Sequence, residues 1–176
     1  RNEITGHLWN RLLCRLIPNE QQTKEENENE SRHTKPKRKQ FLFDGKEEHN
    51  MSGIIRYLTN KSGGNVHDKG VVNVKGSSEN GPGVLAKFAV DLDAKSTRFR
   101  SNDAENSWLQ YDFRERKVHP THYSIRSKPY GPGDFHPQHW VIEGSNTGEN
   151  DWKILDTRQN ISVLNAASVT HVFDIQ

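Results

Sequence analysis

The stretch His139–Leu155, HWVIEGSNTGENDWKIL, contains the clearest structural signal in the chain. In its first half Trp140 and Ile142 fall on one face of an extended chain, and Val141 falls on the other. This period-2 alternation of aromatic and β-branched residues predicts a half-buried strand. A run of turn formers follows, in which Gly148 can take a positive φ at no steric cost. The extended pattern then resumes, so the stretch predicts two strands, bounded by tryptophans, that form a local core.

Similar short apolar segments, separated by turns, occupy the chain from Phe41 onward. The further predicted strands are Val71–Val74, Ser107–Phe113, Tyr123–Ile125 and His171–Ile175, with weaker candidates at 84–92 and 98–100. Gly53–Leu58 predicts either a short strand or a helical turn, and the proline- and glycine-rich residues 128–138 predict a loop. Short strands at turn-punctuated spacing, without convincing helices, predict an all-β fold, either a sandwich or a jelly roll.

The composition allows one modest hydrophobic core. Only 31% of the 176 residues are hydrophobic and 27% are charged, while the net charge is +2. This nearly balanced charge does not demand a nucleic-acid surface, so no nucleic-acid partner is expected. The lone Cys14 excludes an internal disulfide framework and favours a reducing compartment. The sequence has no run of about 18 apolar residues and no visible signal peptide, so we expect a cytoplasmic protein without membrane insertion.

Residues 5–17, TGHLWNRLLCRLI, predict an amphipathic helix. Their leucine, tryptophan and isoleucine residues recur at the spacing of one helical stripe. Thr5 can cap the start of this helix and Pro18 stops it. We interpret residues 1–18 as the last helix of a missing upstream helical domain. A membrane-surface helix is the alternative, although only two arginines provide positive charge on its polar face.

Residues 19–40 predict a flexible linker. They contain no large hydrophobic residue and run from acidic to basic, so they cannot bury enough apolar surface to offset the entropy of ordering. Lys35–Lys39, KPKRK, resembles a short nuclear-import signal, and a solvated basic linker is the simpler interpretation. Nuclear nucleic-acid binding through the same residues is a further possibility, and it predicts a steep salt dependence of binding.

Three segments taken together resemble one known family. They are Asp103–Phe113, DAENSWLQYDF, then Tyr123–Arg126, YSIR, and then Trp140–Trp152, which begins WVIEGSN. In these segments the chain is similar to the discoidin domain, also called the F5/8 type C domain, of the galactose-binding-like family. Thr147 stands where that family has Asp. The resemblance implies a jelly-roll β-sandwich over residues 41–176 that binds ligands through loops at one end.

More narrowly, Gly53–Thr59 and Gly63–Val72 resemble intracellular discoidin-like domains of protists that follow a BTB/BACK-type helical region. The predicted helix at Leu8–Ile17 is similar to the tail of such a region. The family ends with two further strands, whereas this sequence stops at His171–Ile175. Missing strands leave sheet edges unpaired and core faces open to water. The resemblance therefore implies a sandwich that is C-terminally incomplete and marginally stable alone.

The residue types that support catalysis or metal binding form no recognisable pattern. No pair among six histidines has the i, i+4 spacing of a helical metal site, and Cys14 is distant from them in sequence. These histidines are His67, His119, His122, His136, His139 and His171. Asp91 and Asp93 end a predicted strand, where solvation is the simpler account. The sequence contains no nucleophile elbow, phosphate-binding glycine loop or Cys–His pattern. We expect no catalytic residue, no metal and no cofactor, and hence no enzyme.

Loops are the candidate ligand-binding elements. The resemblance implies loops that project from one end of the sandwich, here residues 76–85, 94–106 and 128–138. The last two contain aromatic rings and polar groups of the kind that sugar binding needs. The candidate ligand-binding residues are Arg98, Arg100, Asn102, Tyr130, Phe135 and His136. The alternative is that Tyr130 and Phe135 only pack their loop onto the sandwich.

The sequence as a whole predicts a non-catalytic recognition module that binds a protein or a glycan. An alternative function comes from the resemblance alone. It is the substrate-recognition part of a BTB-type ubiquitin-ligase adaptor, whose missing upstream domain would contact the ligase scaffold.

Overall fold

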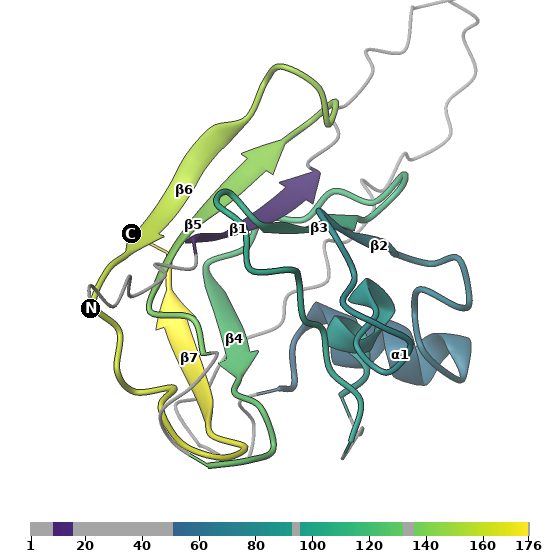
Figure 1. Cartoon of the computed structure of the whole chain (residues 1–176). Helices are drawn as coiled ribbons and strands as arrows, with labels where there is room; N and C mark the ends of the chain where they lie inside the picture. Colours follow the sequence, from purple (N-terminus) through teal and green to yellow (C-terminus); the bar gives the residue numbers. More distant parts are fainter. Residues whose placement is uncertain (1–8, 16–50, 93–95, 132–135, 176) are drawn as a thin grey trace, which may run out of the picture.

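Two β-sheets and little helix make up the described part of the chain (Figure 1). The computed structural model describes residues 9–15, 51–92, 96–131 and 136–175. The larger sheet has the strand order β2 (Asn73–Gly76), β3 (Trp108–Asp112), β1 (Trp9–Arg15), β5 (His139–Ser145) and β6 (Lys153–Arg158). The smaller sheet pairs β4 (His122–Arg126) with β7 (Thr170–Asp174). The helical elements are α1 (Ile54–Ser62) and the 3-10 helix η2 (Ala86–Val90).

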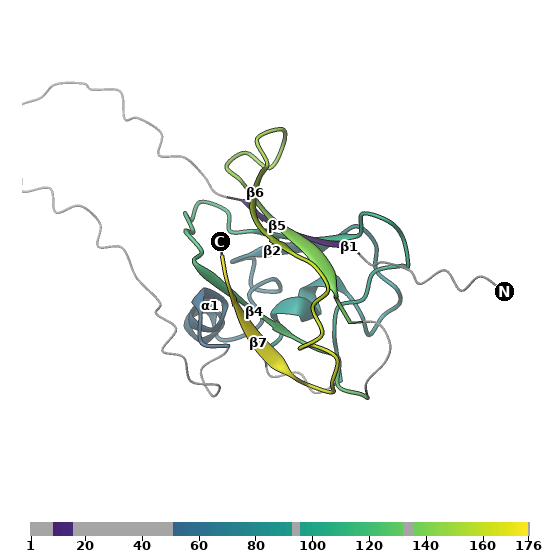
Figure 2. The same cartoon turned by 90° about the vertical axis from the view of Figure 1, so that its left-hand side faces the viewer.

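Most of the strands that the sequence predicts are present. The two strands that the stretch His139–Leu155 predicts are present as β5 and β6. They also pair with each other in antiparallel orientation, and Gly148 in their turn has a φ of 81°. β3, β4 and β7 fall on or beside their predicted segments. The prediction of a mostly β chain is therefore confirmed. Residues of both sheets line one shared cavity, which is compatible with a β-sandwich. Figure 2 shows the pair of β4 and β7 on one side of β1, β5 and β6.

Three segments differ from the predictions. Gly53–Leu58 contributes to a helix, α1, which ends at Gly63 in the left-handed conformation typical of a helix C-terminus. The weak strand candidate at 84–92 contains the 3-10 helix η2, whose first and last residues, Ala86 and Val90, are buried. Residues 98–100 form no strand, and β2 begins two residues after the predicted start.

The predicted helix at residues 5–17 is wrong over Trp9–Arg15, because these residues form β1 in the middle of the larger sheet. β1 runs parallel to both neighbours, with Leu12 in register with Leu109 of β3 and Ile142 of β5. Without β1, both neighbouring strands would leave a row of backbone donors and acceptors open. Pairing on two sides outweighs the helical spacing of a short segment. The rest of the predicted helix and the predicted linker lie outside the described residues.

The hydrophobic core consists of two clusters. The first lies beside α1 and includes Leu58, Val66, Val72, Val74, Ala86, Val90 and Phe113. The second joins β5 to the smaller sheet and includes Trp140, Ile142, Leu164 and Phe173. The rings of Trp140 and Phe173 meet edge to face with 5.0 Å between their centroids, which is a favourable aromatic geometry. The predicted core role of Trp140 is thus confirmed, whereas Trp152 is only half-buried.

A hydrogen-bonded network of side chains connects the two sheets. Tyr123 on β4 donates its hydroxyl hydrogen to Asp156 Oδ2 on β6 at 2.5 Å and accepts from Trp140 Nε1 at 2.8 Å. Arg158 Nε donates to the same Asp156 oxygen at 2.8 Å, and Arg158 also pairs with Asp174 on β7. Burial and the Asp156 carboxylate raise the pKa of Tyr123 far above its usual range, while that carboxylate also raises the pKa of Arg158. The network therefore contains a neutral phenol, a carboxylate and a guanidinium.

The turn between β5 and β6 is organised around the Asp151 carboxylate. Asp151 accepts hydrogen bonds from the hydroxyl groups of Ser145 and Thr147 and from the backbone N–H groups of Asn146 and Thr147. These donors stabilise the charged form, so the pKa of Asp151 lies well below its usual range. The turn is thus held by a network that requires an ionised carboxylate.

Acidification is expected to weaken this turn. An Asp carboxylate whose pKa is lower in the folded state than in the unfolded state stabilises the fold at pH values above its unfolded pKa, which is about 3.9. This stabilisation is lost as the pH falls through the folded value. Asp151→Asn should lower the melting temperature at pH 7, and the difference from the parent protein should shrink as the pH falls below about 4. Melting curves from pH 7 to pH 2 measure this difference, and a constant difference would contradict the role of Asp151.

Candidate functional site

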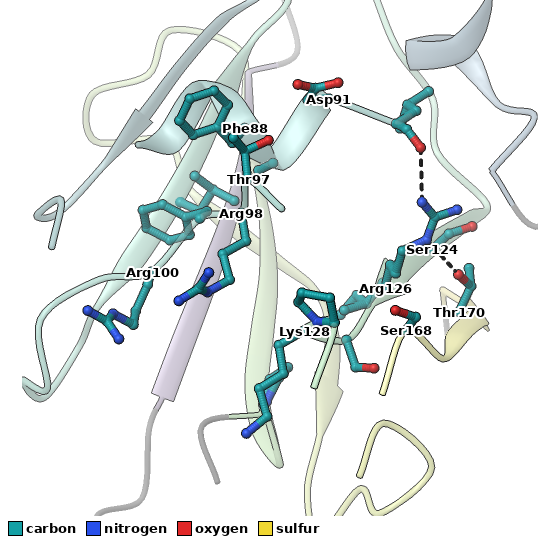
Figure 3. Close-up of a pocket in the computed structure, with 18 of the residues that line it drawn as sticks. Phe88, Asp91, Thr97, Arg98, Arg100, Ser124, Arg126, Lys128, Ser168 and Thr170 are labelled. Carbon is teal, nitrogen blue, oxygen red and sulfur yellow. Dashed lines mark hydrogen bonds between the residues drawn. The ribbon is translucent and has the colours of Figure 1, made fainter. Parts of the chain in front are cut away.

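A cavity of about 950 Å³ lies between the two sheets (Figure 3). Leu109, Tyr111, Trp140 and Ile142 of β3 and β5 contribute an apolar wall. Residues of β4 and of the segment around η2 line it as well. Ligand pockets in proteins typically enclose about 300–1,000 Å³. The cavity is therefore large enough for a small ligand or for a few residues of a polypeptide.

Positive charge dominates the polar part of the cavity lining. Its described basic residues are Arg56, Arg98, Arg100, Arg126 and Lys128, and its described acidic residues are Asp91 and Asp103. Five cations against two anions give this lining a formal net charge of +3. Figure 3 labels four of these five cations: Arg98 and Arg100 belong to the loop before β3, and Arg126 and Lys128 to the end of β4 and the loop after it. The fifth cation, Arg56, belongs to α1. The chain as a whole is nearly neutral, so this charge is a local property of the cavity.

Arg126, at the end of β4, spans part of the cavity. Its Nη1 donates to the carbonyl oxygen of Leu92 at 2.9 Å, and its Nε donates to Thr170 Oγ1 at 3.0 Å (Figure 3). Both acceptors are neutral. The guanidinium is therefore held in place without a carboxylate partner among the described residues, and its charge remains available to an anion.

Arg98 and Arg100 also have neutral partners among the described residues. Arg100 Nη2 donates to the side-chain oxygen of Asn80 at 3.1 Å. The guanidinium carbon of Arg98 lies 4.9 Å from the centroid of the Tyr130 ring, and Lys128 Nζ lies 5.7 Å from the same centroid. Cation–π contacts of this kind fix the direction of a cation but do not neutralise its charge.

The structure brings three of the six predicted ligand-binding residues to the cavity, namely Arg98, Arg100 and Tyr130. Asn102 is exposed outside the described lining, where its backbone N–H donates to Ser78 Oγ. Phe135 falls in residues 132–135, which the structure does not describe. His136 is buried and is not part of the described lining, although its neighbour Pro137 is.

His136 lies in an environment that favours its neutral form. Only 8% of the residue is exposed, and neither ring nitrogen has a hydrogen-bond partner among the described residues. Burial, and then the charge of Lys128, lower the pKa of His136 below its usual value. A neutral imidazole beside Pro137 is best described as packing next to the cavity.

The predicted binding residues did not include Arg126 or Lys128. Lys128 begins the loop that the sequence singles out, and Arg126 closes the strand before it. A residue at the end of a strand lies at the same end of the sheet as the loop that follows. The position of Arg126 and Lys128, at and just after the end of this strand, was therefore the feature of the sequence that could have indicated them as binding residues. Phe88 and Asp91, near the end of η2, also line the cavity. A weak strand at 84–92 does not predict that these two residues belong to a binding site.

Two further features of the described residues concern metals and membranes. Within residues 9–15, 51–92, 96–131 and 136–175, no group of three or more His, Cys, Asp or Glu side chains is arranged to hold a metal ion. In the same ranges, no helix has the length and apolar character needed to cross a bilayer.

Comparison of the chain with protein-family models, with curated proteins and with solved structures finds no match. The resemblance to the discoidin domain consequently stays a prediction from the sequence motifs.

Proposed function

We propose that this chain is a non-catalytic recognition module, and that its ligand occupies the cavity between the two sheets. The observation that supports this most strongly is the combination of an apolar wall and several cations in the lining of one cavity of about 950 Å³. Pockets that bind ligands commonly pair apolar surface with a few oriented polar groups. The described lining combines arginine, lysine and serine side chains with this apolar surface.

The sequence motifs support a finer description of this module. We infer that the two sheets belong to a jelly-roll sandwich of the discoidin type, and that the loops at 96–106 and 128–131 are its ligand-binding loops. Arg98, Arg100 and Tyr130 of these loops line the cavity, which agrees with this inference. The single cysteine supports a cytoplasmic location.

The ubiquitin-ligase adaptor remains an alternative that rests on the resemblance alone. The helical tail of an upstream domain, expected at residues 5–17, does not support it. Residues Trp9–Arg15 instead form the central strand of the larger sheet, so this part of the chain belongs to the β-structure itself.

Filling the cavity should abolish ligand binding. Ala89 is half-buried and lines the cavity, so Ala89→Trp places an indole there. Val163→Trp is the control, because Val163 is 42% exposed and lies outside the described lining. Both variants and the parent protein would be screened against a glycan array and a random peptide library, after melting curves show that each is folded.

We expect the parent protein and Val163→Trp to retain the same ligands, and Ala89→Trp to lose them by about tenfold or more in affinity. Ligands that bind all three proteins equally would show that the binding site is elsewhere and would contradict the proposal.

A further inference from the structure

The apolar and the charged residues that line the cavity differ in their exposure. Two residues of the apolar wall, Trp140 and Ile142, are only 2% and 1% exposed. The arginines are more accessible, since Arg98 is half-buried and both Arg100 and Arg126 are exposed. The cavity therefore has an apolar bottom and a positively charged rim, which consists of these three arginines.

The arginines of the rim have no carboxylate partner among the described residues. Arg100 donates to a side-chain amide, and Arg126 donates to a hydroxyl group and a backbone carbonyl group. Within the described part of the chain, the guanidinium of Arg98 donates no hydrogen bond, and its contact is with the Tyr130 ring. A guanidinium pairs with both oxygens of a carboxylate through two parallel hydrogen bonds. A ligand carboxylate would therefore give Arg98 an acceptor that these residues do not provide.

Tyr130 positions two cations beside this rim. The guanidinium carbon of Arg98 and Nζ of Lys128 lie over its ring, at 4.9 and 5.7 Å from the centroid. These contacts direct the cations without neutralising their charge. They also occupy the ring on which a sugar would stack. An anion is therefore a better match to this rim than a neutral sugar.

The bottom of the cavity requires an apolar ligand group. A small inorganic anion would pair with the rim and leave Trp140 and Ile142 without a ligand contact. A hydrocarbon would cover this wall but would offer no acceptor to the arginines. Removing methylene groups from water contributes affinity in proportion to the area buried. One molecule with an anionic head and an apolar body matches both parts of the lining.

We propose that the cavity binds a carboxylic acid with an apolar body. Its carboxylate pairs with Arg98 and Arg100 at the rim, and its hydrocarbon part lies against Trp140 and Ile142. Arg126, held by its hydrogen bonds to Leu92 and Thr170, adds positive charge to the rim. This inference rests on the proposed function, because it assigns a ligand class to the same cavity.

The test is isothermal titration calorimetry of the full 176-residue chain at neutral pH, with straight-chain ligands kept below the concentrations at which they form micelles. Hexanoate, octanoate and decanoate share the carboxylate and differ in the length of the apolar body. Octan-1-ol and octylammonium have the length of octanoate but a neutral and a positively charged head. Acetate has the carboxylate and almost no apolar body.

We expect octanoate to bind, and octan-1-ol, octylammonium and acetate each to bind more weakly by about tenfold or more. Each pair of added methylene groups should tighten the binding of the carboxylates by about tenfold. Arg98→Gln combined with Arg100→Gln should weaken octanoate by about tenfold or more and reduce the salt dependence of its binding. The same double variant should leave the binding of octan-1-ol unchanged.

The control is Lys117→Gln combined with Lys153→Gln. This double variant removes the same charge from exposed positions outside the described lining, so it should bind octanoate as the parent protein does. Melting curves establish that both double variants are folded.

Equal binding of octan-1-ol and octanoate would overturn the role of charge, and equal binding of acetate would overturn the apolar body. Octanoate binding that persists in Ala89→Trp would place the acid outside the cavity and would also overturn the proposal. If no carboxylate binds, but the library screen gives ligands that Ala89→Trp loses, only the ligand class is wrong. If Ala89→Trp loses no ligand in either experiment, the proposed function itself fails.

Discussion

Replacing Leu12 by proline should unfold the larger sheet and lower the stability of the whole described domain by about 3 kcal/mol or more. Leu12 is at the middle of β1, in register with Leu109 on one side and Ile142 on the other. Proline removes a backbone donor and cannot be accommodated in a central strand without breaking the ladder. Thermal and urea unfolding curves, followed by tryptophan fluorescence, measure the loss.

Leu12→Val is the matched control, because valine keeps the backbone N–H and suits a strand. It should change the stability by less than about 1 kcal/mol. If Leu12→Pro unfolds at the same temperature as the parent protein, β1 is not part of the sheet. The central position of β1 would then have to be abandoned.

Replacing Asp156 by alanine should have the second large effect, about 3–5 kcal/mol of lost stability. Asp156 is 3% exposed and accepts hydrogen bonds from both Tyr123 and Arg158. Its removal leaves the largely buried Arg158 guanidinium without its closest carboxylate, at 2.8 Å. Pairing with Asp174 compensates only in part, because the Asp174 side chain is 67% exposed. Denaturant unfolding at neutral pH measures the loss.

Tyr123→Phe separates the two components of this network. It removes the phenol that donates to Asp156 and accepts from Trp140, but it keeps the ion pair and the ring that stacks on Phe173. The expected loss is about 1–3 kcal/mol, smaller than that of Asp156→Ala. A loss as large as that of Asp156→Ala would show that the ion pair contributes little and that the phenol is the main component.

The sequence predicted those strands whose pattern is contained within a short stretch of the chain. β5 and β6 could be predicted because their alternation, the turn formers between them and Gly148 lie within one short stretch. β1 could not be predicted, because its leucine-rich residues fit a helical stripe as well as an extended chain. Its actual conformation depends on pairing with β3 and β5, whose residues in register with Leu12 are 97 and 130 positions away in sequence. Long-range pairing of this kind is not visible in a window of neighbouring residues.

Of the residues that line the candidate site, the sequence predicted only some of those that lie in loops. Tyr130 lies in a segment whose prolines and glycines predict a loop, while Arg98 and Arg100 lie in a loop that only the resemblance implies. All three residues line the cavity. For Arg126 the sequence offered only its position at the end of a predicted strand, and its contacts across the cavity follow from how the two sheets are placed. The hydrogen bond from Arg126 to Leu92 joins residues 34 positions apart, and no spacing rule links them.

The most direct test of the account is nuclear magnetic resonance of the isotope-labelled chain during titration with a ligand found in the glycan and peptide screens. A ligand that occupies the cavity should shift the backbone amide signals of residues 124–128 and 98–100 most strongly. The exposed residues of β6, on the far edge of the larger sheet, should change little. Shifts confined to β6, or scattered over the surface without a maximum at β4, would contradict a recognition site between the two sheets.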